Sequence, residues 1–136
     1  MERQVFLFVT HFYSEEIRKT FSRFRKSVKK QGPCLILYHQ RPGETVPEGL
    51  PDLPHHIIDE KHLLDLGYYQ PTSSLVPGSN HFCLLRFARE HDYDYYWHIE
   101  YDVRFSGSWA GFFDYFSVSD DDFLSSHIRS YAEEPG

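Results

Sequence analysis

The chain has 136 residues, of which 40% are hydrophobic and 18% aromatic. That length and composition fit one folded domain and argue against intrinsic disorder and against a scaffold held by disulfides. Lysine and arginine number 14 against 20 aspartate and glutamate, for a net charge of −6. The chain as a whole lacks the positive field of proteins that bind nucleic acid non-specifically. We therefore predict a single domain over residues 1–136 that does not bind nucleic acid.

The two cysteines and the N-terminal residues narrow the class further. Cys34 and Cys83 lie far apart and form no Cys-x-x-Cys pair, so we expect buried, reduced thiols. The apolar run at residues 5–9 is too short for a signal peptide, and no stretch is long enough to span a bilayer. These features predict a cytoplasmic protein with no transmembrane segment.

The first 38 residues have the pattern of a strand, a helix and a second strand. Residues 4–8 form a continuous apolar run, which is typical of a strand buried in a parallel sheet. Ser14 can cap a helix whose apolar positions recur at helical spacing, namely Ile17, Phe21, Phe24 and Val28. Gly32 and Pro33 end that helix, and residues 34–38 form a second buried strand. Short joints between these elements predict a βαβ unit.

The outer face of this helix is strongly basic. Its cations crowd toward the C-terminal end, where the helix dipole favours positive charge: Arg18, Lys19, Arg23, Arg25, Lys26, Lys29 and Lys30. A solvated helix face is the simpler interpretation, and a phosphate-binding patch is the alternative.

The remaining residues continue the alternation of strands and helices. A proline-rich loop over residues 40–54 leads to a short strand at 55–59 and a helical turn at 61–66. A helix that starts at Ser79 or Asn80 and buries Phe82 and Leu85 follows. The pattern then predicts a strand over 94–105, a helix beginning near 106–108 and a last strand at 122–128. This order predicts an α/β fold with a mostly parallel, Rossmann-like open sheet flanked by helices.

An acidic triplet stands near the end of the strand predicted over residues 94–105. Glu100 and Asp102 flank Tyr101, and in an extended backbone residues two apart face the same side with Cα atoms about 6.5–7 Å apart. Carboxylate oxygens suit Mn²⁺ or Mg²⁺, which bridge proteins to diphosphates. Ligands of open α/β sheets also gather at the carboxyl ends of strands. Two solvated acids at a strand end are the alternative.

At this point the sequence resembles a known family. The hydrophobic strand ending on Glu100 and Asp102, preceded by a helix over residues 80–91, resembles the nucleotide-diphospho-sugar glycosyltransferases of the GT-A fold. Residues 98–109 with 122–127 more closely resemble an uncharacterised branch described only as a domain of unknown function. The resemblance implies that Asp102 binds the metal directly. Glu100 stands where the family usually has an aspartate, so it could be a second metal ligand or could contact the ribose or a metal-bound water.

The same resemblance implies a set of nucleotide-binding positions at strand ends and on the helix before the metal strand. In this sequence they are Thr10, His11, Tyr38, His39, Asn80 and Arg86. Tyr38 or His39 could stack on a base, or could be ordinary core and surface residues. Arg104 could neutralise a phosphate or pair with Glu100 or another nearby acid.

Catalysis would also need a general base on the acceptor side. Asp122, in the acidic run at 120–122, is our candidate beside Asp102, and a solvated turn is the alternative. Other chemistries lack their motifs. There is no His-Glu-x-x-His, no Walker loop and no Gly-x-Gly-x-x-Gly, and residues 107–111 do not match Gly-x-Ser-x-Gly.

The residues and the resemblance together predict a metal-dependent glycosyltransferase-like domain. It would bind a nucleotide-diphosphate sugar with Mn²⁺ or Mg²⁺ and transfer the sugar to an unknown glycan, lipid or protein acceptor. Because few residues follow the metal strand, we expect a truncated or minimal domain of the GT-A type. The first alternative is a non-catalytic nucleotide- or metal-binding domain. A receiver-like signalling domain ranks last, because it needs an acidic pair after the first strand and a lysine after the last one, and both are missing.

Overall fold

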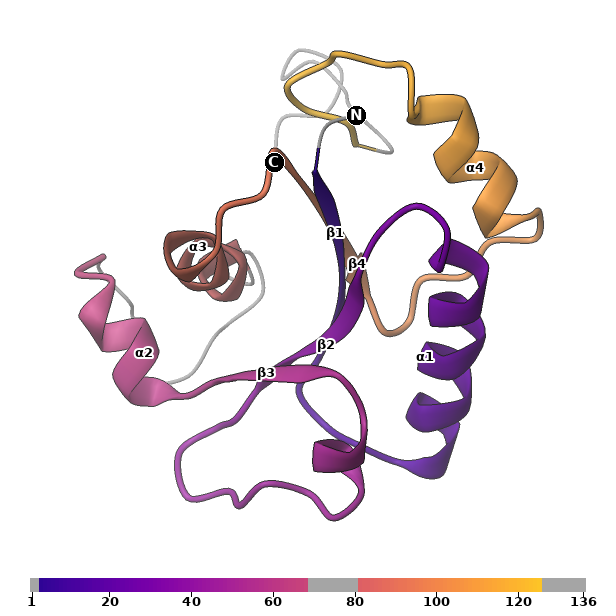
Figure 1. The fold of residues 1–136 in the computed structure, drawn as a ribbon. Helices are drawn as coiled ribbons and strands as arrows, with labels where there is room; N and C mark the ends of the chain where they lie inside the picture. The colour runs from indigo at the N-terminus through magenta and orange to yellow at the C-terminus, as the bar shows by residue number, and fades with distance from the viewer. Residues whose placement is uncertain (1–2, 69–80, 126–136) are drawn as a thin grey trace, which may run out of the picture.

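The computed structural model describes residues 3–68 and 81–125. Its centre is a four-stranded, all-parallel sheet with the order β3-β2-β1-β4 and helices on both faces (Figure 1). The strands are β1 (Gln4–Thr10), β2 (Cys34–His39), β3 (His55–Ile58) and β4 (Tyr95–Glu100). The helices are α1 (Glu15–Val28), α2 (Glu60–Asp65), α3 (His81–Glu90) and α4 (Trp109–Phe116), with a short 3₁₀ turn at Leu50–Asp52. The predicted α/β class and parallel, Rossmann-like sheet are confirmed.

The sheet is buried on both faces because β1 is apolar throughout. Helices α1 and α4 cover one face and α2 and α3 cover the other (Figure 1). Phe6 and Phe8 point to the α1 side, whereas Val5, Leu7 and Val9 point to the α3 side. The continuous apolar run read from the sequence is therefore the central strand of a three-layer domain.

The two cores differ in composition. On the α1 side, the Phe6 ring meets Phe113 edge-on at 4.7 Å and lies parallel to Trp97 at 6.3 Å between ring centroids. Such aromatic pairs add to the free energy gained from burial alone. The α3 side is mainly aliphatic, with Leu7, Leu37 and Ile58 fully buried.

The strand order shows where the direction of strand addition reverses in this sheet. In this sheet β1 lies between β2 and β4, and Val9 stands opposite Leu37 on one side and Glu100 on the other. The order 3-2-1-4 is that of the Rossmann sheet, whereas receiver-like domains use 2-1-3. This finding removes the receiver-like alternative. The strand order reverses between β1 and β4, so their carboxyl ends flank the crevice where open sheets bind ligands.

The first helix and both cysteines are as predicted. The Ser14 hydroxyl oxygen caps α1 by accepting a hydrogen bond from the Ile17 N–H at 3.2 Å. Cys34 and Cys83 are free and buried, and burial raises the pKa of each thiol to about 12. Both thiols are therefore neutral and unreactive at physiological pH.

The prediction for β4 was too long. The strand ends at Glu100, where the Val103 N–H donates to the Glu100 carbonyl at 3.0 Å and closes a turn over Tyr101 and Asp102. Arg104 holds this turn by donating from Nη1 to the Tyr101 carbonyl at 2.8 Å. The aromatic and β-branched residues that follow continue the β pattern in sequence, but no neighbouring strand pairs with them within the part of the chain that the structure describes.

Two further predictions were wrong. Residues 122–125 form no strand, and residues 126–128 lie outside the described residues. Phe123 is 75% exposed, so its hydrophobicity does not reflect a place in the sheet. In α3, Phe82 is buried as expected, but Leu85 faces solvent while Cys83 and Phe87 pack on the sheet. Within residues 3–68 and 81–125, no helix is both long and apolar enough to cross a membrane.

Candidate functional site

The acidic turn after β4, which comprises Glu100, Tyr101 and Asp102, lies at the carboxyl edge of the sheet. Glu100 is half-buried, whereas Asp102 is exposed and has no hydrogen bond or ion pair among the described residues. Because Asp102 lies in a turn, the prediction that strand geometry sets both carboxylates on one side was wrong. Asp102 nevertheless fits a Mn²⁺ or Mg²⁺ site of the kind completed by phosphate oxygens and water, in which the protein supplies one or two carboxylates.

His98 lies two residues before Glu100 on the α3 face of the sheet. Its Nε2 is buried and has no hydrogen-bond partner among the described residues. Burial lowers the pKa of this imidazole, and the Glu100 carboxylate opposes that shift. Sequence reasoning did not select His98, although the two-residue period of a strand places it on the same face as Glu100.

The loop after β1 is shaped by Thr10. Its side chain is 2% exposed, and Oγ1 donates to the Phe12 carbonyl at 2.8 Å while accepting from the Phe12 N–H at 3.3 Å. The hydroxyl is thus engaged within its own loop. Its structural effect is to turn the chain so that the rings of His11 and Phe12 reach toward β4.

These rings form an aromatic cluster with the acidic turn. The cluster comprises His11, Phe12 and Tyr101, whose ring centroids are 4.9–5.5 Å apart in edge-to-face arrangements. It joins the ends of β1 and β4 where the strand order reverses. Phe12 is 39% exposed, so the cluster offers an aromatic surface beside Asp102. Only His11 was predicted. Phe12 and Tyr101 could have been found in the sequence as aromatic residues next to the end of a strand.

The end of β2 places two predicted residues differently. Tyr38 is 3% exposed and packs in the core on the α1 side, which matches the alternative of an ordinary core residue. His39 is 6% exposed, and its Nε2 has no hydrogen-bond partner within the described residues. Burial, followed by the cation of Arg41, lowers the pKa of His39. His39 is therefore a neutral imidazole at the carboxyl edge of the sheet.

A turn at residues 41–44 supplies two charges that sequence reasoning missed. The Arg41 N–H donates to Glu44 Oε2 at 3.2 Å, and Gly43 has a positive φ of 81°. Burial is the main cause that lowers the pKa of His11 and of His39. The Arg41 cation lowers both further, and the Glu44 carboxylate opposes this effect. The turn therefore stands within electrostatic reach of the ends of β1 and β2. In the sequence, the only indication of this charged turn is that Pro42-Gly43 has a charged residue on each side.

Arg86 is not brought to this edge. Its Nε donates to Glu90 Oε1 at 2.8 Å along α3, and Glu90 Oε2 lies 3.0 Å from Nε2 of His56 at the start of β3. The guanidinium is thus occupied toward the amino ends of the strands. Asn80 lies outside the described residues.

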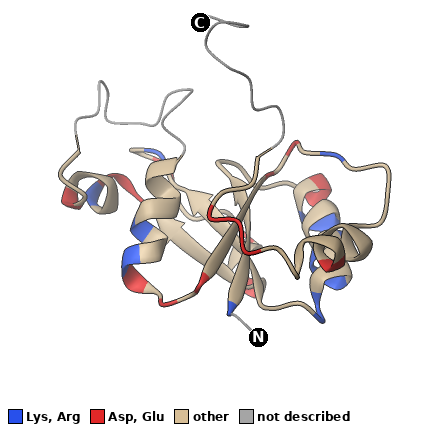
Figure 2. Ribbon diagram, turned by 90° about the horizontal axis from the view of Figure 1, so that it is seen from above, with Lys and Arg blue, Asp and Glu red and all other residues tan. Residues whose placement is uncertain are grey.

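Arg104 lies in the segment after β4, and Asp122 lies in the segment after α4. The segment that follows α4 runs back across the amino ends of β1 and β4 (Figure 1), and Figure 2 shows its acidic stretch crossing the sheet in the view along the strands. The segment that contains Asp122 thus lies toward the amino ends of these strands, whereas Asp102 follows the carboxyl end of β4. Arg104 donates to the carbonyls of Tyr101 and Val103.

Comparisons with known proteins bear on the family. Residues 36–121 match the model of a family described as "Protein of unknown function (DUF3405)", which is more than half of the chain. The chain belongs to this family. The matched segment begins in β2 and includes the whole acidic turn. Searches of the curated proteins and of the solved structures found no match. A family of unknown function was expected from the sequence, and the glycosyltransferase relationship stays a prediction.

Proposed function

We propose that this member of the DUF3405 family binds a nucleotide-diphosphate sugar at the carboxyl edge of its sheet and transfers the sugar to an acceptor. The observation that carries this proposal is the exposed carboxylate of Asp102 after the carboxyl end of β4, where the strand order reverses. A Rossmann-like sheet binds nucleotides at this position. The resemblance of the acidic turn to the metal-binding motif of GT-A glycosyltransferases supports the same assignment.

Each part of the donor has a matching group. Asp102 would hold Mn²⁺ or Mg²⁺, and that ion when bound would stabilise the charge on the departing diphosphate. Glu100 would accept a hydrogen bond from a ribose hydroxyl or orient a metal-bound water. The aromatic cluster provides a surface on which a base can stack, and such stacking contributes about 1–3 kcal/mol per base. Arg41 is a further candidate for a phosphate contact.

Calorimetric titration of UDP and GDP with and without Mn²⁺ tests the proposal. Asp102→Ala should abolish the Mn²⁺-dependent part of nucleotide binding. Asp65→Asn is the matched control, since Asp65 is an exposed aspartate at the end of α2. Unchanged binding in Asp102→Ala, or equal loss in both variants, would overturn the proposal.

A non-catalytic nucleotide-binding domain is the second candidate. The course of the segment after α4, which contains the predicted base, favours it, because this segment runs toward the amino ends of β1 and β4 (Figure 1). A panel of nucleotide sugars incubated with Mn²⁺ separates the two functions. Release of free nucleotide diphosphate by the native protein, lost in Asp102→Ala, indicates transfer or hydrolysis of the sugar. Binding without release indicates the non-catalytic domain.

A further inference from the structure

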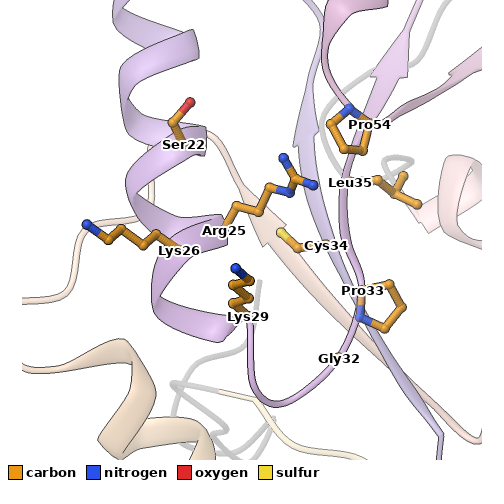
Figure 3. A pocket seen from close by; sticks show the side chains of 9 residues that line it. All are labelled: Ser22, Arg25, Lys26, Lys29, Gly32, Pro33, Cys34, Leu35 and Pro54. Atoms are coloured by element: carbon orange, nitrogen blue, oxygen red, sulfur yellow. The ribbon is translucent and has the colours of Figure 1, made fainter.

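A concave surface lies at the amino end of the sheet, away from the acidic turn. It is an open cleft of about 600 Å³ between the C-terminal half of α1 and the start of β2 (Figure 3). Three cations line it from α1, and we call it the basic cleft. Arg25 and Lys29 project from the helix toward Cys34, whereas Lys26 extends from the outer side of α1 (Figure 3).

The charge of the basic cleft is uncompensated. No acidic side chain lines the cleft within the described residues. Arg25, Lys26 and Lys29 are exposed, and none of the three has an ion pair with another described residue. Their positive charges are thus available to an anion from solution.

The opposite wall of the cleft is neutral. It is formed by Pro33, Cys34 and Leu35 at the start of β2 and by Pro54 before β3. Burial raises the pKa of Cys34 to about 12 although the nearby Arg25 cation opposes the shift. The thiol is therefore uncharged and does not repel an anion, while the prolines and Leu35 provide apolar contact for an organic group.

The shape of the basic cleft depends on a tight connection from α1 to β2. The Gly32 N–H donates to the Val28 carbonyl at 3.3 Å, and the Pro33 carbonyl accepts from the Phe6 N–H at 2.9 Å. A Cβ at Gly32 would lie only 2.7 Å from the carbonyl oxygen of Gln4. Close approach of the backbones thus fixes where the helix ends relative to the sheet.

The basic cleft is separate from the acidic turn. It lies at the amino end of β2, whereas the turn lies at the carboxyl edge of the parallel sheet. Six residues of β2 at about 3.3 Å each place the two regions roughly 20 Å apart along the strand. One ligand group cannot contact both.

The charges indicate which ligand suits the cleft. A carboxylate has a single negative charge, whereas two cations in the gap and a third beside it match a group with two or more. The Ser22 hydroxyl adds an uncharged hydrogen-bonding group on the same helix. We propose that the basic cleft binds the phosphate monoester or diphosphate group of a phosphorylated compound. Charge-assisted hydrogen bonds from Arg25 and Lys29 would hold the phosphate, and its organic part would lie against Leu35 and Pro54.

Inorganic pyrophosphate, titrated without divalent metal and in the presence of a chelator, is the direct probe. The amide resonances of Gly32 and Leu35 should shift on binding. Arg25→Gln with Lys29→Gln should weaken binding at least about tenfold, which equals about 1.4 kcal/mol. Arg23→Gln with Lys19→Gln is the matched control. It removes one arginine and one lysine from exposed positions of the same helix outside the cleft.

Two arms of the experiment distinguish the source of the phosphate. Phosphatidylcholine vesicles with and without phosphatidylinositol bisphosphate test a lipid headgroup. Binding that requires both this lipid and the pair Arg25 and Lys29 supports a membrane source, whereas pyrophosphate binding without vesicle binding supports a soluble one. The proposal fails if the native protein binds neither probe, or if the control pair weakens binding as much as the cleft pair.

Discussion

The two ends of the parallel sheet differ in charge and in burial. The carboxyl edge combines the exposed Asp102, the half-buried Glu100 and the buried imidazole of His39. At the amino end, Arg25 and Lys29 stand free above a neutral wall. A net charge of −6 describes neither end. The net charge of the whole chain argues against binding of a multiply charged anion, but the local charge at the amino end favours it.

The direction of the elements explains part of this difference. Because α1 runs antiparallel to the strands it joins, its C-terminus lies at their amino ends, where the negative end of the helix dipole favours cations. Lys29 and Arg25 thus stabilise the helix whether or not they bind a ligand. Two readouts of the variant pair Arg25→Gln and Lys29→Gln separate these roles. Loss of dipole stabilisation lowers the free energy of unfolding, whereas loss of the ligand contacts lowers the affinity for pyrophosphate.

The largest expected effect comes from testing a variant at each end of the sheet with both ligands. Asp102→Ala should weaken Mn²⁺-dependent nucleotide binding at least about 100-fold, since even changes outside the first ligand shell cost 10- to 100-fold. The pair Arg25→Gln and Lys29→Gln should change that binding by less than about twofold, since distant sites act independently. Calorimetry on both variants with both ligands measures this. A similar loss of nucleotide binding in both variants would mean that the two ends form one site.

Gly32→Ala tests the amino end by stability. The added Cβ would clash with the Gln4 carbonyl oxygen at 2.7 Å, and we expect a loss of about 2 kcal/mol in the free energy of unfolding. Gly111→Ala in α4 is the control. Its Cβ meets only Ser108 at 3.7 Å, so it should gain about 0.5–1 kcal/mol from helix propensity. Urea denaturation measures both, and equal stability of the two variants would contradict the close approach.

The carboxyl edge should be sensitive to acid through His39. Burial lowers its pKa below the ordinary 6.5, so the unfolded chain binds a proton before the folded one as the pH falls. The contribution of the neutral His39 to the free energy of unfolding is complete above about pH 6.5. Below that pH it is lost, by up to about 1.4 kcal/mol per pH unit. The free energy of unfolding, measured by urea denaturation at several pH values between 7.5 and 5, should have a smaller slope against pH in His39→Gln than in the native protein. The reason is that about one proton less is taken up on unfolding. A slope equal to that of the native protein would contradict this assignment.

Thr10→Val should have the smallest effect on stability. It removes both hydrogen bonds that join Oγ1 to Phe12, at a cost of about 1 kcal/mol. The loop also presents the rings of His11 and Phe12, so nucleotide binding should weaken as well. Thr20→Val in α1 is the control, and thermal unfolding together with calorimetry checks both readouts. Loss of stability with full nucleotide binding would show that the aromatic cluster does not contact the ligand.

Much of the fold could be predicted because its signals are local. The apolar run of β1, the Ser14 cap and the helical spacing of α1 each lie within a few neighbouring residues. The end of β4 could not, because Val103 and Phe105 have high β propensity and only the backbone hydrogen bond to Glu100 shows the turn. The prediction of a strand at residues 122–125 was wrong for a similar reason, since hydrophobicity alone does not show whether a neighbouring strand is present.

The site was only partly predictable because it depends on which strands are neighbours. Strand-end reasoning selected His11, Glu100 and Asp102, and the order β2-β1-β4 brings the ends of their strands together. Phe12 and Tyr101 become a cluster only through that pairing. Arg41 and Glu44 were missed because their relation to His11 and His39 is made by a turn between β2 and β3. The cations of the basic cleft were noted in the sequence, with a phosphate-binding patch as the alternative, but α1 alone does not show the neutral wall opposite them.

A crystal structure with a nucleotide diphosphate and manganese tests the central claim most directly, because anomalous scattering locates the ion independently of the model. Our account predicts a manganese peak between the Asp102 carboxylate and the β-phosphate, with the base near His11, Phe12 and Tyr101. Nucleotide and manganese bound elsewhere on the protein, or a manganese peak that does not contact Asp102, would contradict it.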